Sequence, residues 1–148
     1  QQIERFLMEF AEFDLKHLEM YGFQMVSVDA KTYRWERLDL ALVVSHEPIE
    51  GNLSFKFELD NSGLSIFAAL DVVFHDLGGR GILLSNQFSR PRTAVEFELK
   101  RFQWLAMLER IEPYLKDSAS IAEVIKRRRN SLLVWPPPEL IPKPTLGE

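Results

Sequence analysis

The first side chains of this sequence that could do chemistry together are a carboxylate and an imidazole three residues apart. Asp14 falls near the middle of an apolar helical stripe, and His17 follows on the same face. A carboxylate that orients an imidazole is half of a hydrolytic triad or part of the outer shell of a metal site. The sequence offers no matching nucleophile motif. We favour the alternative that Asp14 caps a neighbouring backbone or pairs with an arginine.

A second group of acidic and imidazole side chains comprises Asp71, His75 and Asp76, and His46 could be a fourth member. Two carboxylates and two imidazoles could bind a divalent metal if they converged. Their spacing matches no known ligand pattern, so the solvated polar face of a helix is the favoured interpretation. The chain has no cysteine, which excludes thiolate metal sites and a cysteine nucleophile. We therefore expect neither a metal nor another cofactor.

The glycine-rich run at residues 78–81 could expose backbone N–H groups to a phosphate. It follows a predicted helix rather than preceding one, and no Lys-Ser or Lys-Thr pair comes after it. We interpret it as a helix stop followed by a loop.

Basic residues near the C-terminus could bind phosphate, anionic lipid or an acidic partner. Arg128 lies near the apolar stripe of its predicted helix, so we expect it to be partly buried and paired. The candidate partner-binding residues are the basic residues beside Arg128 and the tryptophan that precedes three prolines. They are Lys126, Arg127, Arg129 and Trp135. Intramolecular pairing is favoured for the basic run. The Pro-rich segment could dock on a partner, but covering its own domain or exchange in a dimer is favoured.

The elements that must position these residues begin with an amphipathic helix. Apolar residues at helical spacing predict a helix over residues 3–21, with Gly22 as its left-handed stop. Alternating and β-branched segments then predict antiparallel strands, with 38–46 a central strand covered on both faces. These strands are 23–28, 32–37, 38–46 and 53–59.

The next segment fits either type of secondary structure. We favour a helix over residues 65–77, capped by Ser65 and stopped by Gly78 and Gly79, although Ile66 to Leu70 could form a strand. Residues 80–92 are predicted to be a loop, with a short strand at 82–84 as an option.

A long helix with two apolar faces is predicted after a capping box at Thr93–Glu96. Pro113 should end it near residue 112. A second capping box, Ser120–Glu123, predicts a last helix that runs to about Trp135. The two faces of the long helix are formed by Val95, Leu99, Phe102 and Ala106 on one side and by Phe97, Trp104, Leu108 and Ile111 on the other. One face should pack on the sheet, and the other needs a neighbouring helix or a second subunit.

Length and charge limit the class of protein. The 148 residues fit one α+β domain at 1–135, followed by a Pro-rich arm at 136–148. The net charge of −4 argues against nucleic-acid binding by the whole protein, and no apolar run approaches the roughly 20 residues of a membrane span. The start does not resemble a signal peptide, so we expect a cytoplasmic protein.

The expected fold is an antiparallel sheet of three to four strands, with the N-terminal, long central and C-terminal helices packed mainly on one face. This layout of residues 3–116 resembles small bacterial α+β immunity proteins of polymorphic-toxin systems and related uncharacterised proteins. The resemblance is carried by Tyr21-Gly22-Phe23, by strands bearing Tyr33, Trp35 and Phe55, and by Glu112-Pro113-Tyr114-Leu115. It implies a non-catalytic protein that binds one partner, often a toxin domain, through an acidic surface. No functional residue is transferred by it.

We therefore expect a protein-binding module that is not an enzyme, such as an immunity protein or a regulatory partner. A homodimer through the helix at 94–112 or through the C-terminal arm is compatible with this. The alternative is a small enzyme or ligand-binding protein with its site around Asp14 and His17.

Overall fold

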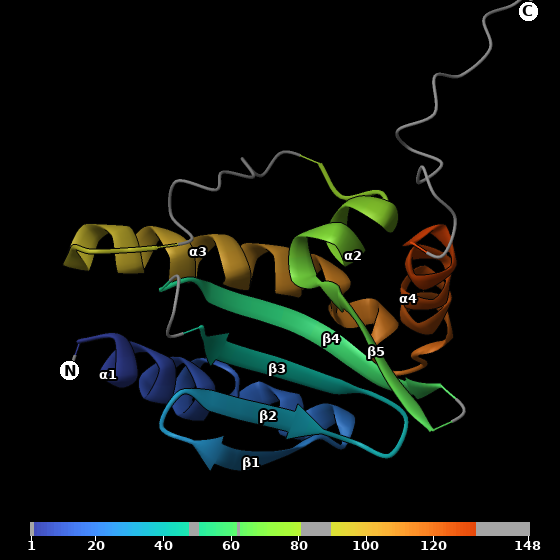
Figure 1. Cartoon of the computed structure of the whole chain (residues 1–148), viewed down its shortest axis with the longest axis horizontal. Helices are drawn as coiled ribbons and strands as arrows, with labels where there is room; N and C mark the ends of the chain where they lie inside the picture. The colour runs from blue at the N-terminus through green and yellow to red at the C-terminus, as the bar shows by residue number, and fades with distance from the viewer. Residues whose placement is uncertain (1, 48–50, 62, 81–89, 133–148) are drawn as a thin grey trace, which may run out of the picture.

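A five-stranded antiparallel sheet forms the centre of the computed structural model, which describes residues 2–47, 51–61, 63–80 and 90–132 (Figure 1). The strands follow one another across the sheet in chain order. They are β1 (Gln24–Asp29), β2 (Thr32–Glu36), β3 (Ala41–His46), β4 (Leu53–Asn61) and β5 (Leu64–Ala69). The α+β class is as predicted, but the sheet has one strand more than the three to four expected.

The additional strand comes from the segment that fits both types of secondary structure. β5 is followed at once by the short helix α2 (Leu70–Asp76), so the predicted helix over residues 65–77 is wrong for its first half. Ser65 does not cap a helix; it lies in the strand opposite Asp60 of β4. Ile66 is buried while its neighbour Phe67 is exposed, which is the two-residue period of a strand covered on one face. α2 ends where predicted, with Gly78 in the left-handed region at φ 92°.

The first helix changes its winding along its length. α1 (Gln2–Glu9) passes into a five-residue π-helical turn, η1 (Phe10–Asp14), and then into a 3₁₀ segment, η2 (Lys16–Tyr21). Gly22 ends this segment at φ 88°, as the sequence predicted. The buried side chains of this segment still lie toward the sheet; they are Leu7, Phe10, Ala11, Leu15 and Leu18.

The long helix α3 (Ala94–Ile111) begins at the predicted cap. The Thr93 hydroxyl accepts a hydrogen bond from the Glu96 backbone N–H at 3.2 Å, while the Glu96 carboxylate accepts one from the N–H of Arg92 rather than of Thr93. Pro113 lies in the 3₁₀ turn η4 (Glu112–Tyr114) directly after α3, as expected.

The last helix, α4 (Ala119–Leu132), begins before the predicted capping box. Ser120 already lies inside the helix, so the box at Ser120–Glu123 is wrong. The Asp117 carboxylate accepts a hydrogen bond from the Ala119 N–H at 3.1 Å and so takes the capping role. The optional strand at 82–84, the end of this helix near Trp135 and the arm at 136–148 lie outside the described residues.

The described helices pack on one face of the sheet, as predicted (Figure 1). α1 lies against β2 and β3, whereas α2 and α4 lie against β4 and β5. Ala41 and Val43 of β3 face the other side and are nevertheless buried, outside the main core cluster. Long side chains of the adjacent strands flank Val43, since Arg34 and Lys56 are its cross-strand partners. The expectation that β3 is covered on both faces thus holds without a second layer of described helices.

Gly79 approaches the ring of Phe74 closely, and this leads to a stability prediction. A Cβ atom at Gly79 would lie 2.4 Å from the Phe74 ring, which is itself only 3% exposed. We expect Gly79→Ala to lower the free energy of unfolding by about 1–3 kcal/mol, because the buried ring must shift. Urea denaturation measures this effect. In a Phe74→Leu background, Gly79→Ala should have almost no further effect on the free energy of unfolding. If the losses of the two substitutions simply add in the double variant, the clash with the Phe74 ring is not the cause.

Candidate functional site

The carboxylate of Asp14 is bound by an arginine of α3. The Asp14 carboxylate accepts two hydrogen bonds from Arg101, from Nε at 2.6 Å and from Nη2 at 2.8 Å. These hydrogen bonds raise the pKa of the Arg101 guanidinium. Asp14 is therefore paired with an arginine, the role favoured from the sequence, and the pair fixes η1 to α3.

The imidazole of His17 faces a different carboxylate. Its Nε2 lies 2.5 Å from Oε1 of Glu112, although the contact is poorly directed for a hydrogen bond. Its Nδ1 lies 3.1 Å from the backbone oxygen of Asp14. The Tyr21 hydroxyl donates to the second oxygen of Glu112 at 3.3 Å, and burial followed by the charge of Glu112 raises the Tyr21 pKa. The structure therefore brings His17 to Glu112 and Tyr21 and does not bring its ring to the Asp14 carboxylate.

Glu112 was missed from the sequence because it lies 91 residues from Tyr21 and carries no local pattern. The Tyr21–Glu112–His17 network joins η2 to the turn after α3 and is half-buried. A hollow of about 190 Å³ does lie beside Asp14 and Arg101, but His17 is not among its lining residues. The most direct role of the network is to hold two elements together.

The second acidic group is also paired within the molecule. Asp76 of α2 accepts hydrogen bonds from Nε and Nη2 of Arg128 on α4, at 2.8 and 2.7 Å. These bonds are the main cause of a lowered Asp76 pKa. The Asp71 carboxylate accepts from the N–H of Val72, and His75 is exposed. Within the described parts of the chain, no three acidic or histidine side chains are placed to hold a metal ion.

Arg128 is partly buried and paired, as the sequence predicted. Lys126 and Arg127 are exposed on α4. The side chain of Arg129 and the whole of Trp135 lie outside the described residues, so the structure does not place these two partner-binding candidates. In the glycine-rich run, Gly78 ends α2 and the Arg80 backbone oxygen accepts a hydrogen bond from Arg110, while Gly81 is not described.

The long helix α3 has the two apolar faces that its sequence predicted. One face is in the core: Phe97, Trp104, Leu108 and Ile111 are each at most 4% exposed. On the opposite side, Val95, Leu99 and Phe102 are 67%, 40% and 69% exposed. We call these three residues the α3 ridge. Their spacing of four and three residues places them in one row along the helix.

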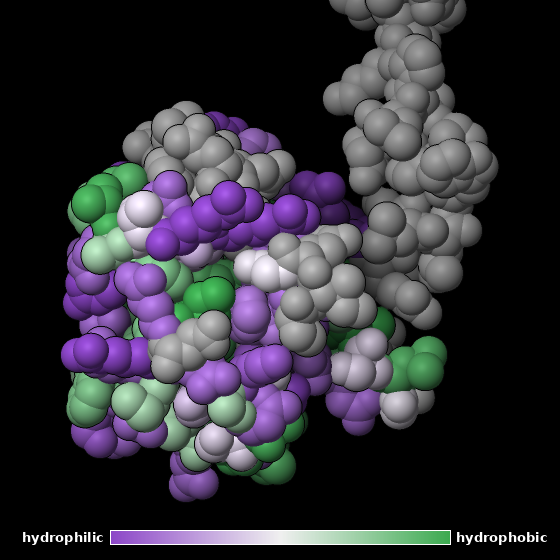
Figure 2. Space-filling model, turned by 60° about the vertical axis from the view of Figure 1, so that its left-hand side comes forward, coloured by the Kyte–Doolittle hydropathy of each residue, from purple (hydrophilic) through white to green (hydrophobic). Residues whose placement is uncertain are grey.

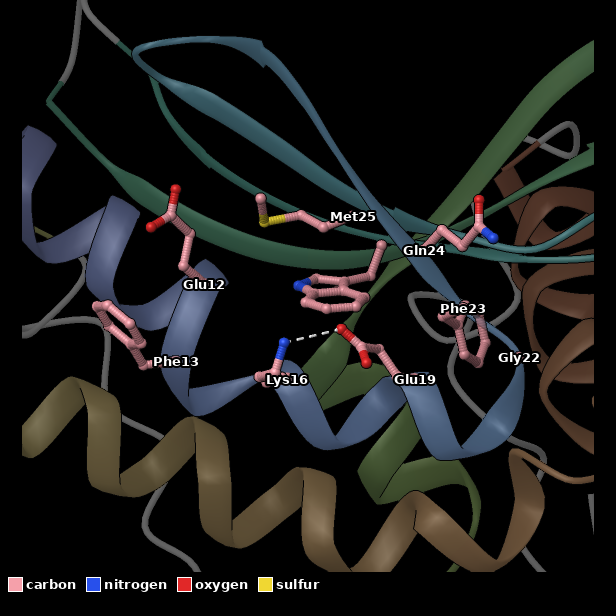
Figure 3. A pocket seen from close by; sticks show the side chains of 9 residues that line it. Glu12, Phe13, Lys16, Glu19, Gly22, Phe23, Gln24 and Met25 are labelled. Carbon is pink, nitrogen blue, oxygen red and sulfur yellow. Dashed lines mark hydrogen bonds and ion pairs between the residues drawn. The ribbon is translucent and has the colours of Figure 1, made fainter.

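A groove lies between the first helical segment and the edge strand β1 (Figure 3). It has a volume of about 720 Å³, and we call it the edge groove. Trp35 lines it while only 3% exposed, and its indole N–H donates to the Ala11 backbone oxygen at 2.8 Å. The other lining residues are Glu12, Phe13, Lys16, Glu19, Gly22, Phe23, Gln24 and Met25.

Phe13 connects the edge groove with the side of α3. Its side chain is 68% exposed, and it lines both the edge groove and the smaller hollow that includes Glu98 and Arg101. On the face drawn in Figure 2, hydrophobic residues lie in small groups separated by hydrophilic ones. This mixture is that of an ordinary protein surface, so overall polarity does not single out a binding face.

Searches against protein-family models, curated proteins and solved structures find no match to this chain. Among the described helices, none combines the length and the apolar character needed to cross a bilayer.

Proposed function

We propose that this chain is a non-catalytic protein-binding module that contacts its partner through the α3 ridge. The observation that carries the proposal is the exposure of Val95, Leu99 and Phe102 on a helix whose opposite side is fully used by the core. Large apolar side chains that gather on a surface mark interaction sites more often than single ones do. A phenylalanine that is 69% exposed has much apolar area to lose to a partner.

The ridge is held in place before any partner arrives. Arg101 fixes the middle of α3 to η1 through Asp14, and the Thr93 cap fixes its start. A rigid apolar row of this spacing suits insertion into a groove of another protein. Because the helix already orders the backbone, the entropy that remains to be lost on binding is mainly that of the side-chain rotamers.

The resemblance to immunity proteins favours a toxin domain as the partner, and a regulatory partner or a second copy of the chain would use the same ridge. Among the basic candidates, Lys126 and Arg127 are free of the core and suit an additional contact with an acidic surface. We place the primary contact on the ridge, because aromatic residues such as Phe102 are enriched and charged residues are depleted at the buried centre of interfaces.

Photo-crosslinking in the native cell tests this proposal. A photoreactive amino acid at Leu99 should give a defined protein adduct, and adding Phe102→Ser should reduce its yield roughly tenfold. The same amino acid at Leu38, which is fully exposed between β2 and β3, is the matched control and should give no such adduct. The Phe102→Ser protein should keep its free energy of unfolding within about 0.5 kcal/mol, so lost crosslinking cannot reflect unfolding.

The mass of the adduct identifies the occupant of the ridge. An adduct of two copies shows a homodimer, and an adduct with another protein shows a heteromeric partner. Equal crosslinking from Leu99 and Leu38, or an adduct that Phe102→Ser leaves unchanged, would contradict the proposal.

A further inference from the structure

We propose that β1 and the edge groove accept an extended, basic segment of a partner protein as a sixth strand of the sheet. This inference rests on the proposed function only in taking the ligand to be a protein. It concerns a surface that the α3 ridge does not include.

The first argument is the open edge of β1. This strand is at one end of the sheet order and pairs with β2 alone among the described strands. In an antiparallel pair, alternate residues direct their backbone N–H and C=O groups away from the partner strand, so half of these groups in β1 face the open edge. β1 contains no proline and no lysine, two residues that commonly protect an edge from further pairing. The other edge strand, β5, is in contact with α4 and α2.

The regular part of this edge is short and well defined. The pairing of β1 with β2 is continuous from Gln24 to Ser27, and the register shifts between Ser27 and Asp29. Such an irregularity twists the strand and limits further pairing beyond it. An added strand is therefore expected to align with residues 24–27.

The second argument is the position of the edge groove beside this strand. Met25 of β1 and Phe13 of η1 line the groove from opposite sides (Figure 3), and Trp35 of the neighbouring strand β2 lines it as well. Successive side chains of a strand point to opposite sides of the sheet. Every second side chain of an added strand would therefore face the helical side and could enter the groove, which is the usual source of specificity in strand addition.

The third argument is charge, which selects the type of segment. Glu12 and Glu19 lie on the groove. Lys16 is the one lysine among its described lining residues, and it already pairs with Glu19 at 3.1 Å. Burial raises the pKa of Tyr33 on β2, and the nearby negative charges of Glu12, Glu4 and Asp29 raise it further. No ion pair of Glu12 is found among the described residues, so lysine or arginine side chains of a bound segment would complement this surface.

A peptide titration followed by NMR tests the inference on the intact chain. The probe is the blocked peptide Lys-Val-Lys-Phe-Lys-Val-Lys, and its counterpart with glutamate in place of every lysine is the control ligand. We expect the basic peptide to shift the amide signals of residues 24–27 and to slow their hydrogen exchange. The acidic peptide should do neither.

Two charge reversals distinguish this site from general attraction to an acidic protein. Glu12→Lys should weaken binding of the basic peptide roughly tenfold, whereas Glu109→Lys, the same change at an exposed position on α3, should have little effect. Phe102→Ser should leave peptide binding unchanged, so failure of the ridge and failure of the groove can be told apart. Equal weakening by the two reversals would overturn the inference, as would signal shifts located away from β1 or equal binding of both peptides.

Discussion

Trp104→Ala is expected to lower the free energy of unfolding by about 3–5 kcal/mol, the range for deleting a large aromatic side chain from a core. The indole is only 4% exposed. Its ring centroid lies 5.2 Å from that of Phe10 and 5.5 Å from that of Phe55, so it joins the first helical segment, the sheet and α3. Alanine would leave a cavity between these three elements, which cannot all move inward to fill it.

Guanidinium denaturation followed by circular dichroism measures this loss without relying on the deleted fluorophore. Phe102→Ala is the matched control, because it removes a large aromatic from the same helix at an exposed position and should change stability by no more than about 0.5 kcal/mol. Equal losses in the two variants would mean that both faces of α3 are covered in solution. That result would also remove the basis for a free α3 ridge.

Arg37→Met is expected to cost about 2–4 kcal/mol of stability, because it breaks several charge-assisted hydrogen bonds at once. The guanidinium Nη1 donates to the backbone oxygens of Tyr21 and Leu115, at 2.6 and 2.8 Å. Its Nε donates to the carboxylate of Asp39 at 2.6 Å. One side chain thus joins the ends of two helical segments to the β2–β3 connection. Methionine keeps the aliphatic part of the side chain, but it loses the guanidinium that lies 4.4 Å from the centre of the Phe23 ring and leaves both carbonyls without this donor.

Arg34→Met is the matched control for this change. Arg34 also makes two ion pairs, with Glu36 at 3.2 Å and Glu58 at 2.9 Å, but these lie on the sheet face that carries no described helix. Neither pair supplies a donor to a backbone carbonyl, so methionine at position 34 leaves no carbonyl unsatisfied, and we expect a smaller loss of about 1 kcal/mol. A cost for Arg34→Met as large as that for Arg37→Met would contradict the role assigned to the Arg37 carbonyl contacts.

The pH dependence of stability gives a second readout for Arg37. The hydrogen bond from Arg37 is the main reason that the Asp39 pKa is lowered, and a second bond from Ser118 adds to it. A carboxylate with a lowered folded-state pKa stabilises the protein above its ordinary pKa, and this contribution is lost as the pH falls through the lowered value. The stability difference between the wild type and Arg37→Met should therefore narrow on acidification. A difference that is constant from neutral to strongly acid pH would show that Asp39 plays no part in it.

Most elements of the fold could be predicted from local patterns. The alternation from Leu53 to Leu59 and the cap at Thr93 correspond to β4 and the start of α3. The junction of β5 and α2 could not be predicted in this way, because Ile66 to Leu70 is apolar enough for either type of secondary structure. Pairing with β4 decides in favour of the strand, and that is a tertiary interaction. The winding of the first helix was missed for a similar reason, since its stripe of apolar residues is compatible with a regular helix.

The surface features differ in how far the sequence reveals them. The two faces of α3 follow directly from the spacing of Val95, Leu99 and Phe102, so the ridge could be predicted. The contact of His17 with Glu112 could not, because the fold brings together residues that are far apart in the chain. The edge groove was also missed, since it arises from the gap between the π turn that carries Phe13 and an edge strand whose position depends on the whole sheet.

The chain-order arrangement of the strands has a consequence for how the protein forms during synthesis. Each strand pairs with the one made just before it, so every step in building the sheet closes only a short loop, at a small cost in chain entropy. The first helical segment and all five strands leave the ribosome before α3 exists. Phe10 and Phe55, which contact each other, are synthesised before Trp104, so Trp104 packs onto this aromatic pair later. Until α3 and then α4 have packed, the partly covered sheet exposes apolar surface, which makes the nascent chain prone to aggregation at this stage.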